Sequence, residues 1–297
     1  MAVAWVFPGQ GSQKIGMAET VVSLPGARQR FALASERLGR DLLAICSGEG
    51  DGEGVMNLND TRNTQPALFV VESLLVDALH DQGRQPALVA GHSLGELVAL
   101  YAAGVFDADT GLALMQRRSE LMATAGGGAM TAVIGFDAEQ LRDLVAATEG
   151  VVIANDNSEA QVVLSGTPEA VAAVTGALRC KRAIPLAVSG AFHSPFMEEA
   201  AALFARELES VTFADASVPV LSNTDPTPER AGDRLKARLI AQMTSGVRWR
   251  ETMARLPMEG IRTAVEIGPG NVLSGLIKRG CPDLETAQVS TAADLGL

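Results

Sequence analysis

Two kinds of apolar pattern alternate along this chain. Short apolar runs, each as long as a buried strand, alternate with longer stretches in which apolar residues recur three and four positions apart. Such alternation is typical of an α/β fold with a mostly parallel sheet. Strands are expected at Ala2–Phe7, Pro86–Gly91, Val218–Ser222 and Thr263–Ile267, and helices at Ala27–Leu38, Gln65–Gln82, Leu94–Gly104, Ala108–Ala125, Pro195–Val211, Arg230–Met243, Arg248–Arg255 and Val272–Arg279.

The pattern changes after a glycine run, Gly126–Gly128. The next 60 or so residues predict the order β-α-β-β-α-β, which is that of a ferredoxin-like module. We therefore expect a large α/β domain made of residues 1–126 and 190–297, with a small ferredoxin-like domain, residues 127–189, inserted into it. The module's elements are expected at Ala129–Gly135, Ala138–Ala147, Val151–Asn155, Gln161–Gly166, Pro168–Arg179 and Arg182–Ser189.

Composition excludes several classes of protein. Of 297 residues, 47% are hydrophobic, which is enough for a full core and argues against disorder. A formal charge of −11 argues against a protein whose main role is to bind nucleic acid or an anionic membrane. The longest apolar run, Leu97–Phe106, is about half of what spans a bilayer. The N-terminus lacks the features of a signal peptide, so we expect a cytoplasmic protein.

The three cysteines, Cys46, Cys180 and Cys281, lie far apart in the sequence. Their number is odd and their spacing pairs none of them, so they predict neither a disulfide framework nor a metal site.

One short motif carries a candidate nucleophile. Residues Gly91–Gly95 read G-H-S-L-G, which has the form G-x-S-x-G, between an expected strand and an expected helix. This is the setting of a nucleophile elbow, where side chains at the two glycines would clash with the tightly turned backbone. Ser93 would then stand at a helix N-terminus, where free N–H groups face developing negative charge. The alternative is an ordinary strand-to-helix turn, and the flanking elements favour the nucleophile.

A serine nucleophile needs a base, and the chain has three histidines. His80 lies near a helix end beside Asp81, as a solvent-facing residue would. His92 adjoins Ser93, but neighbouring side chains on such a turn point apart. His193 remains, directly after an expected strand and before Pro195, and strand ends are where α/β sites form. Its alternative is a helix-entry histidine bonded to local backbone; elimination favours the base.

The third member of a triad is not evident. An α/β-hydrolase would place an Asp or Glu between the serine and the histidine in sequence. The acids in that interval fall mostly in helices of the inserted module, and none ends a strand of the large sheet. The sequence therefore predicts a Ser–His pair that is oriented by something other than a carboxylate.

An arginine on the expected helix 108–125 is placed to be buried. The residues three and four positions from Arg118 are all apolar, whereas Arg117 also neighbours Glu120. A buried guanidinium needs a partner. Spacing alone leaves three readings open: an internal salt bridge, a side chain that reaches outward to solvent, or a bidentate hold on a substrate carboxylate.

Together these residues resemble the malonyl-CoA:acyl carrier protein transacylase family and the related acyltransferase domains of polyketide synthases. The resemblance runs from about residue 3 to about residue 280. It rests on seven motifs in order: F-P-G-Q-G-S-Q (7–13), T-Q-P-A-L (64–68), G-H-S-L-G-E (91–96), R-x-x-x-M (118–122), G-A-F-H-S-P (190–195), Q-M-T-S-G-V-R-W (242–249) and E-I-G-P-G (266–270). The resemblance implies an α/β-hydrolase-like core with an inserted ferredoxin-like module.

The resemblance also implies roles. Ser93 would carry the malonyl ester and His193 would be its base. Backbone N–H groups of Gln10 and Leu94 would stabilise the oxyanion, each by about 3 kcal/mol. Arg118 would hold the malonyl carboxylate. The backbone carbonyl of Gln242 would orient the histidine, so its side chain is expected to be dispensable.

Three further positions match the family. Asn155 and Asn157 match a segment that lines the cleft between the modules; turn asparagines of a hairpin are the equal alternative. Phe192 precedes the base, as in members that select malonyl. Its ring would crowd the C2 methyl group of methylmalonyl, which favours malonyl as the substrate.

The implied reaction is ping-pong transfer of malonyl from malonyl-CoA to the phosphopantetheine thiol of acyl carrier protein, with no cofactor and no metal. The carrier is acidic in this family, so basic pairs are needed for docking, and Lys181/Arg182 and Lys278/Arg279 are candidates; solvated surface charge is the alternative. We expect a discrete monomeric enzyme. The alternatives are the transacylase subunit of malonate decarboxylase, a trans-acting polyketide acyltransferase and, more remotely, a serine hydrolase.

Overall fold

The computed structural model describes residues 2–49, 56–188 and 190–297. Its larger sheet has five strands in the order β7-β2-β1-β8-β9, and every neighbouring pair in it is parallel. The parallel sheet predicted from the sequence is therefore confirmed. In chain order these strands are β1 (Val3–Phe7), β2 (Leu88–Gly91), β7 (Val220–Leu221), β8 (Thr263–Ile267) and β9 (Glu285–Val289).

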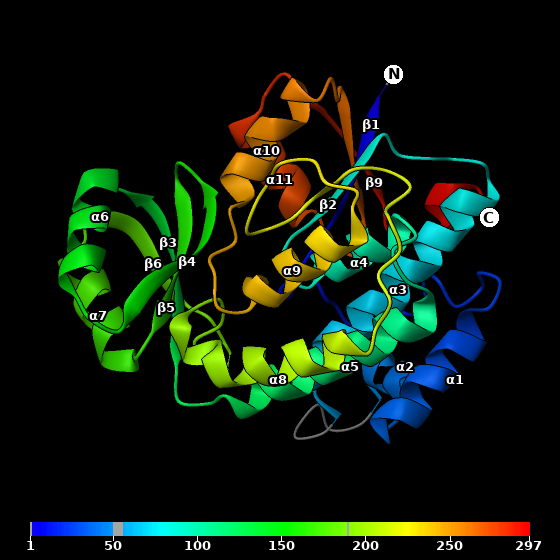
Figure 1. Cartoon of the computed structure of the whole chain (residues 1–297), viewed down its shortest axis with the longest axis horizontal. Coiled ribbons are helices and arrows are strands. Elements are labelled where there is room, and N and C mark those ends of the chain that lie inside the picture. The colour runs from blue at the N-terminus through cyan, green and yellow to red at the C-terminus, as the bar shows by residue number, and fades with distance from the viewer. Residues whose placement is uncertain (1, 50–55, 189) are drawn as a thin grey trace.

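Helices cover both faces of this sheet, as Figure 1 shows. Side chains alternate across the strands, so Trp5 and Phe7 of β1 pack into the main core while Ala4 and Val6 pack into a second one. The main core includes α1 (Ala27–Leu38), α2 (Leu42–Ser47), α3 (Thr61–Asp81), α4 (Gly95–Ala102), α5 (Ala108–Thr124), α8 (Glu198–Glu209) and α9 (Gly232–Gln242). The second core includes α10 (Trp249–Met258) and α11 (Val272–Gly280).

Residues 129–185, here called the small module, form a four-stranded antiparallel sheet in the order β4-β5-β3-β6. Two helices cover one face of it around a core of their own. The other face contributes Met130, Ala132, Ala154 and Val163 to the main core. The elements are β3 (Ala129–Phe136), α6 (Ala138–Ala147), β4 (Val151–Ser158), β5 (Gln161–Gly166), α7 (Pro168–Ala177) and β6 (Cys180–Pro185).

Strand β4 also ties the small module to the rest of the chain. Ala154 accepts a backbone hydrogen bond from Val247, and Val247 accepts one from Asp156. The Asp156 carboxylate pairs with Arg250 at 2.8 Å. The segment that follows α9 is therefore fixed to the small module by backbone and side-chain contacts.

Several elements differ from the sequence prediction. Helix α3 begins at Thr61 rather than Gln65, because the Asp60 side chain caps it by accepting from the Arg62 N–H. Strand β4 extends to Ser158, through the two asparagines. The expected helix from Pro195 begins with a 3₁₀ turn, Pro195–Met197. Helix α2, strand β9 and the 3₁₀ turn Ala292–Leu295 were not predicted. Ser189, the last residue of the expected strand 182–189, lies outside the described residues.

Among the described residues, no helix combines the length and the apolar character that a membrane span requires.

Candidate active site

The site lies where three neighbouring strands end. Strands β7, β2 and β1 are adjacent and parallel, so their carboxyl ends meet at one edge of the sheet. Asn223 lies just beyond β7, Ser93 beyond β2 and Gln10 beyond β1. Such an edge is where α/β folds form their binding sites.

The backbone around Ser93 turns sharply. Ser93 has φ 54°, in the left-handed region that is uncommon for a residue with a side chain. A Cβ on Gly91 would lie 1.9 Å from the carbonyl of Gly95, and a Cβ on Gly95 would lie 2.2 Å from the carbonyl oxygen of Phe7. Glycine is therefore required at both positions for steric reasons, and Ser93 comes just before Leu94, the N-cap of α4.

The structure brings Ser93 and His193 together. Ser93 Oγ lies 2.7 Å from His193 Nε2, and His193 Nδ1 lies 3.0 Å from the backbone carbonyl oxygen of Gln242. A carbonyl can only accept, so Nδ1 carries the proton and Nε2 is left as the acceptor for the serine hydroxyl.

His193 itself sits on a strained turn, with φ 55°. Sequence reasoning placed it directly after the expected strand 182–189 and cited strand ends as the place where α/β sites form. Instead, β6 ends at Pro185 and belongs to the antiparallel sheet, so this part of the reasoning was wrong. The chain needs the intervening residues to pass from the edge of the small module to the end of β2.

Burial keeps the His193 imidazole neutral. Desolvation, together with the nearby charge of Arg118, lowers the pKa of His193 to about 3. The side chain is therefore uncharged at neutral pH and can accept a proton from Ser93.

Arg118 is fully buried, as its apolar helical neighbours predicted. Its Nη1 donates to Gln65 Oε1 at 2.7 Å and its Nη2 donates to Gln242 Oε1 at 2.8 Å. Nη2 also lies 3.4 Å from Ser93 Oγ. Burial lowers the pKa of Arg118 to about 10, so the guanidinium keeps its charge at neutral pH. Arg117, by contrast, pairs with Glu120 and Glu207 at the surface.

The side chain of Gln242 joins the two halves of the site. Its Nε2 donates to the Ser93 carbonyl oxygen at 2.9 Å and to Glu96 Oε2 at 2.7 Å, while its Oε1 accepts a hydrogen bond from Arg118 Nη2. The expectation that this side chain is dispensable therefore has no support in the contacts. Sequence reasoning considered only the backbone carbonyl, because side-chain contacts across 149 residues leave no mark in the sequence.

Sequence reasoning also missed three buried polar residues: Gln65, Glu96 and Asn223. Gln65 and Glu96 stood inside motifs that were read for other positions, T-Q-P-A-L and G-H-S-L-G-E. Burial raises the pKa of Glu96, whereas its hydrogen bonds from Gln242 and Asn223 and the charge of Arg118 lower it. The signal available was an acid directly after the elbow, on an otherwise apolar helix.

The two asparagines of β4 lie in a strand rather than in a hairpin turn, and both are buried. Asn157 Oδ1 lies 2.8 Å from His92 Nε2, and Asn155 Nδ2 lies 3.4 Å from the same nitrogen. The ring of His92 also meets Trp249 edge to face, with centroids 5.5 Å apart. His92 is therefore engaged with β4 and α10, while the neighbouring Ser93 faces His193.

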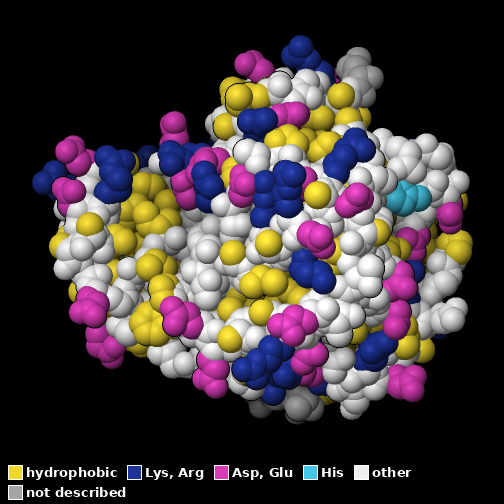
Figure 2. Space-filling model, in the orientation of Figure 1, with side chains coloured by type: hydrophobic (Ala, Val, Ile, Leu, Met, Phe, Trp, Pro, Cys, Tyr) yellow, Lys and Arg dark blue, Asp and Glu magenta, His cyan; other side chains and the backbone are white. Residues whose placement is uncertain are grey.

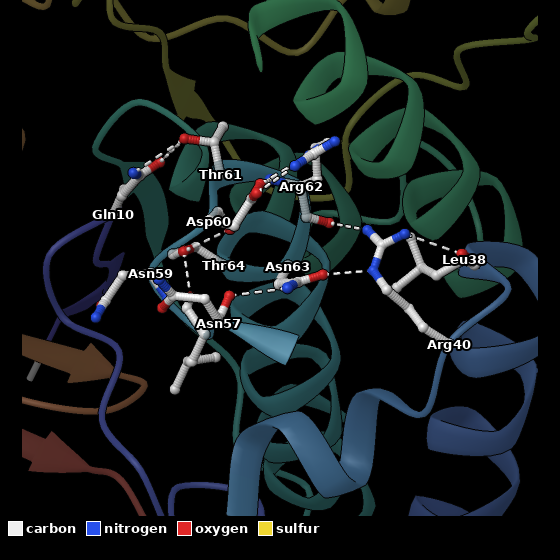
Figure 3. Close-up of polar contacts among 11 residues, drawn as sticks. Gln10, Leu38, Arg40, Asn57, Asn59, Asp60, Thr61, Arg62, Asn63 and Thr64 are labelled. Atoms are coloured by element: carbon white, nitrogen blue, oxygen red, sulfur yellow. Dashed lines mark hydrogen bonds and ion pairs between the residues drawn. The ribbon is translucent and has the colours of Figure 1, made fainter. Parts of the chain in front are cut away.

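A pocket opens over the Ser93–His193 pair between the sheet edge and the small module. Gln10, Leu94, Phe192 and Asn155 line it together with Met122 and Met130. The Gln10 side chain is held by Thr61, whose helix is capped by Asp60, as Figure 3 shows. The Gln10 side chain is thereby tied to the first residue of α3.

The four basic residues that are candidates for carrier docking lie outside the pocket. Lys181 and Arg182 are exposed on the edge strand β6, and Lys278 and Arg279 are exposed in the last turn of α11. His80, expected to face solvent, instead stacks on Trp5 with ring centroids 5.2 Å apart, and burial lowers its pKa.

This arrangement can perform nucleophilic acyl transfer, since it combines an activated hydroxyl, a neutral base and a buried cation beside them. Comparison with known families agrees: the chain belongs to the family described as acyl transferase domain, whose model matches residues 4–296. The resemblance drawn from the motifs is therefore confirmed.

The chain is 51% identical to a malonyl CoA-acyl carrier protein transacylase of Synechocystis sp. over 295 residues, 99% of each chain. A crystal structure of a Synechocystis malonyl-CoA:ACP transacylase, also 51% identical, superposes with a TM-score of 0.95, covering 100% of this chain and 99% of the other. A third relative is a malonyl-transacylase solved in complex with a type II polyketide acyl carrier protein. It is 39% identical, with a TM-score of 0.91 over 99% of this chain and 98% of the other.

Proposed function

We propose that this protein transfers the malonyl group of malonyl-CoA to the phosphopantetheine thiol of acyl carrier protein for fatty-acid synthesis. The observation that carries the proposal is the position of the buried Arg118 guanidinium, 3.4 Å from the Oγ of a serine that is hydrogen-bonded to a neutral histidine. A cation at this distance from the nucleophile suits an acyl group that ends in a carboxylate.

The first half-reaction forms an acyl-serine. His193 Nε2 takes the Ser93 proton while Oγ attacks the thioester carbon, and the backbone N–H groups of Gln10 and Leu94 stabilise the oxyanion. Collapse of this intermediate breaks the carbon–sulfur bond, and the CoA sulfur takes the proton from His193. In the second half-reaction the carrier thiol gives its proton to His193 and attacks the ester, and Ser93 regains a proton as it leaves.

Arg118 also acts on the base in this scheme. Its charge disfavours a second positive charge on His193. A malonyl carboxylate held by Arg118 offsets that charge and so favours the imidazolium that forms during the reaction. The Gln242 carbonyl orients the His193 ring, which is the role that an aspartate has in a serine hydrolase.

The test is intact-mass measurement after incubation with malonyl-CoA alone. Wild-type protein should gain one malonyl group, and Ser93→Ala should gain none. Ser210→Ala, which removes an exposed serine at the end of α8, is the matched control and should be acylated like wild type. An adduct that survives Ser93→Ala would contradict the nucleophile assignment. Hydrolysis without transfer to any carrier would favour a serine hydrolase.

The carrier protein that accepts the malonyl group distinguishes fatty-acid synthesis from the alternative pathways. One relative is a malonyl-transacylase solved in complex with a type II polyketide acyl carrier protein, so transfer to fatty-acid, polyketide and malonate decarboxylase carriers should be compared. We propose fatty-acid carrier protein as the preferred acceptor, a cytoplasmic monomer as the working form, and no cofactor or metal beyond the pantetheine arm of the substrates.

For the fold, we propose that the parallel sheet and its helices form an α/β-hydrolase-like domain, residues 1–126 and 190–297, with residues 127–189 as a ferredoxin-like insert. The strand order β4-β5-β3-β6 supports the second part. Asn155 and Asn157 would contact the substrate from the insert, and Phe192 from the large domain.

Docking of an acidic carrier needs local positive charge on a protein of net charge −11. On the face that Figure 2 shows, basic and acidic side chains are interspersed, so on this face a basic pair rather than a broad patch would serve. We propose Lys181 and Arg182, with Lys278 and Arg279 as the second pair. Replacing both Lys181 and Arg182 by Glu, which reverses their charge, should raise the KM for the carrier protein and leave the KM for malonyl-CoA nearly unchanged. Arg28→Glu with Arg84→Glu, the same charge change at other exposed sites, is the control.

A further inference from the structure

Asn223 spans the first half of the turn that presents Ser93. Its side-chain Nδ2 donates to the Gly91 carbonyl oxygen at 2.6 Å, and its Oδ1 accepts the Ser93 N–H at 2.7 Å. One amide group thus joins the residue where β2 ends to the residue that carries the nucleophile. Asn223 is 1% exposed, so water cannot replace these contacts without a rearrangement of the site.

The conformation that Asn223 spans is an unfavourable one. A left-handed backbone at a non-glycine residue such as Ser93 persists only where its surroundings enforce it. The Gln242 side chain holds the Ser93 carbonyl oxygen, so the peptide groups on both sides of Ser93 have side-chain partners. Glu96 Oε2 accepts from both of these partners, from the Asn223 N–H at 3.1 Å and from Gln242 Nε2 at 2.7 Å.

The geometry points to Asn223 as a positioning residue for the acylation step, one that holds Ser93 in its left-handed conformation with Oγ directed at His193. Without the amide, the Ser93 N–H loses the acceptor that the buried Asn223 side chain supplies, and the turn relaxes toward an ordinary conformation. The hydroxyl then spends less time within 2.7 Å of the base, and the adjacent Leu94 N–H moves with it. The role rests on the proposed function only through Ser93 as nucleophile.

The test measures Ser93 in two ways. Phenylmethanesulfonyl fluoride is a small neutral reagent for activated serines, so its rate of labelling measures the reactivity of the Ser93 hydroxyl independently of malonyl binding. Single-turnover acylation by malonyl-CoA measures the same reactivity with the malonyl group bound. Asn223→Ala should slow both by about 10- to 100-fold, the factor that accompanies an unsatisfied buried N–H. The malonyl-CoA concentration that gives half-maximal acylation should stay within about twofold, because the Asn223 side chain is hydrogen-bonded to Gly91 and Ser93 and its N–H to Glu96, and none of these bonds goes to Arg118 or to the two glutamines that hold it.

Val220→Ala is the matched control. It removes buried side-chain volume from β7, three residues away, without touching the turn, so it should lower the melting temperature and leave the labelling rate unchanged. Asn223→Leu, which has the same branching and neither polar atom, should behave like Asn223→Ala and is measured on the folded fraction where the alanine variant fails to fold.

Labelling of the Asn223 variants at the wild-type rate would overturn the proposal, and so would equal slowing in Val220→Ala. Slower labelling with a parallel rise in the half-saturating malonyl-CoA concentration would also overturn it, because that pattern indicates a general loss of site structure. If wild-type protein reacts with the sulfonyl fluoride but not with malonyl-CoA, the proposed function fails while the role of Asn223 is still measured.

Discussion

At the scale of single residues, Arg118 has two effects that one substitution can separate. It offers a charged partner to a carboxylate, and its charge lowers the pKa of His193. For Arg118→Ala we expect kcat/KM for malonyl-CoA to fall roughly 30- to several thousand-fold, because losing one member of a buried charged pair costs about 2–5 kcal/mol. Acetyl-CoA has no carboxylate to lose, and the base becomes easier to protonate, so acetyl transfer should hold steady or rise.

The measurement is kcat/KM for both thioesters. Arg117→Ala is the control from the same helix, since Arg117 pairs only with surface carboxylates, and it should change neither value. An equal fall for both thioesters in Arg118→Ala would assign the arginine a structural role.

Gln242 is a second residue whose side chain carries a prediction. Gln242→Ala removes the donor to the Ser93 carbonyl and one of the two glutamine acceptors of Arg118, and it leaves Glu96 with fewer partners. Hydrogen bonds to charged groups contribute about 1.5–3 kcal/mol, so acylation by malonyl-CoA should slow by about 10- to 100-fold. Single-turnover acylation checks this, with Gln288→Ala, an exposed glutamine on β9, as the control. Activity near wild type would mean that only the backbone carbonyl matters.

The residues that take part in the chemistry could be found from the sequence, whereas the residues that hold them in position could not. Ser93 stood in a motif with a strand before it and a helix after it, and His193 followed by elimination from three histidines. Asn223 had no such signal, because a single asparagine after a two-residue strand looks like any turn residue. What makes it distinctive is its place at the end of β7 beside β2, and strand order is not written in local sequence.

Among the elements, apolar residues at helical spacing predicted helices, and short apolar runs predicted strands that are buried on both faces. Helices α1 and α6 and strands β5 and β8 were predicted with the bounds that the structure gives them. Helix α2 was missed because six residues are too few to show a helical repeat. Strand β9 was missed because it is an edge strand, E-T-A-Q-V, with exposed side chains and no apolar alternation.

Element ends depended on contacts that spacing does not report. Helix α3 was expected to begin at Gln65, but the Asp60 cap starts it four residues earlier, at Thr61. Strand β4 continues through Asn155 and Asn157 because it stays paired with β5 as far as Ser158, and Val247 also pairs with it from outside the small module. In this extended segment both asparagine side chains lie against His92.

At the scale of the whole molecule, burial of ionisable groups links stability to pH. Burial lowers the pKa of His193 to about 3 and also lowers the pKa values of His92 and His80 below 6.5. Burial raises the pKa values of Glu72 and Glu96 above 4.5. The unfolded chain therefore binds more histidine protons than the folded chain below pH 6.5, which reduces stability as the pH falls. The two glutamates act in the opposite direction, since stability from a raised pKa is lost as the pH rises.

His193 alone should account for a measurable part of the stability that is lost as the pH falls. With a pKa of about 3 when folded and 6.5 when unfolded, it should reduce the free energy of unfolding by about 2 kcal/mol between pH 7 and pH 5. Urea unfolding of wild type and His193→Ala at both pH values gives the test, because the variant should lose about 2 kcal/mol less over that interval. Gln288→Ala adds no titrating change and should follow wild type. Parallel losses in wild type and His193→Ala would mean that the folded protein binds the proton as readily as the unfolded chain. His193 would then not be the neutral buried base on which the acyl-transfer scheme depends.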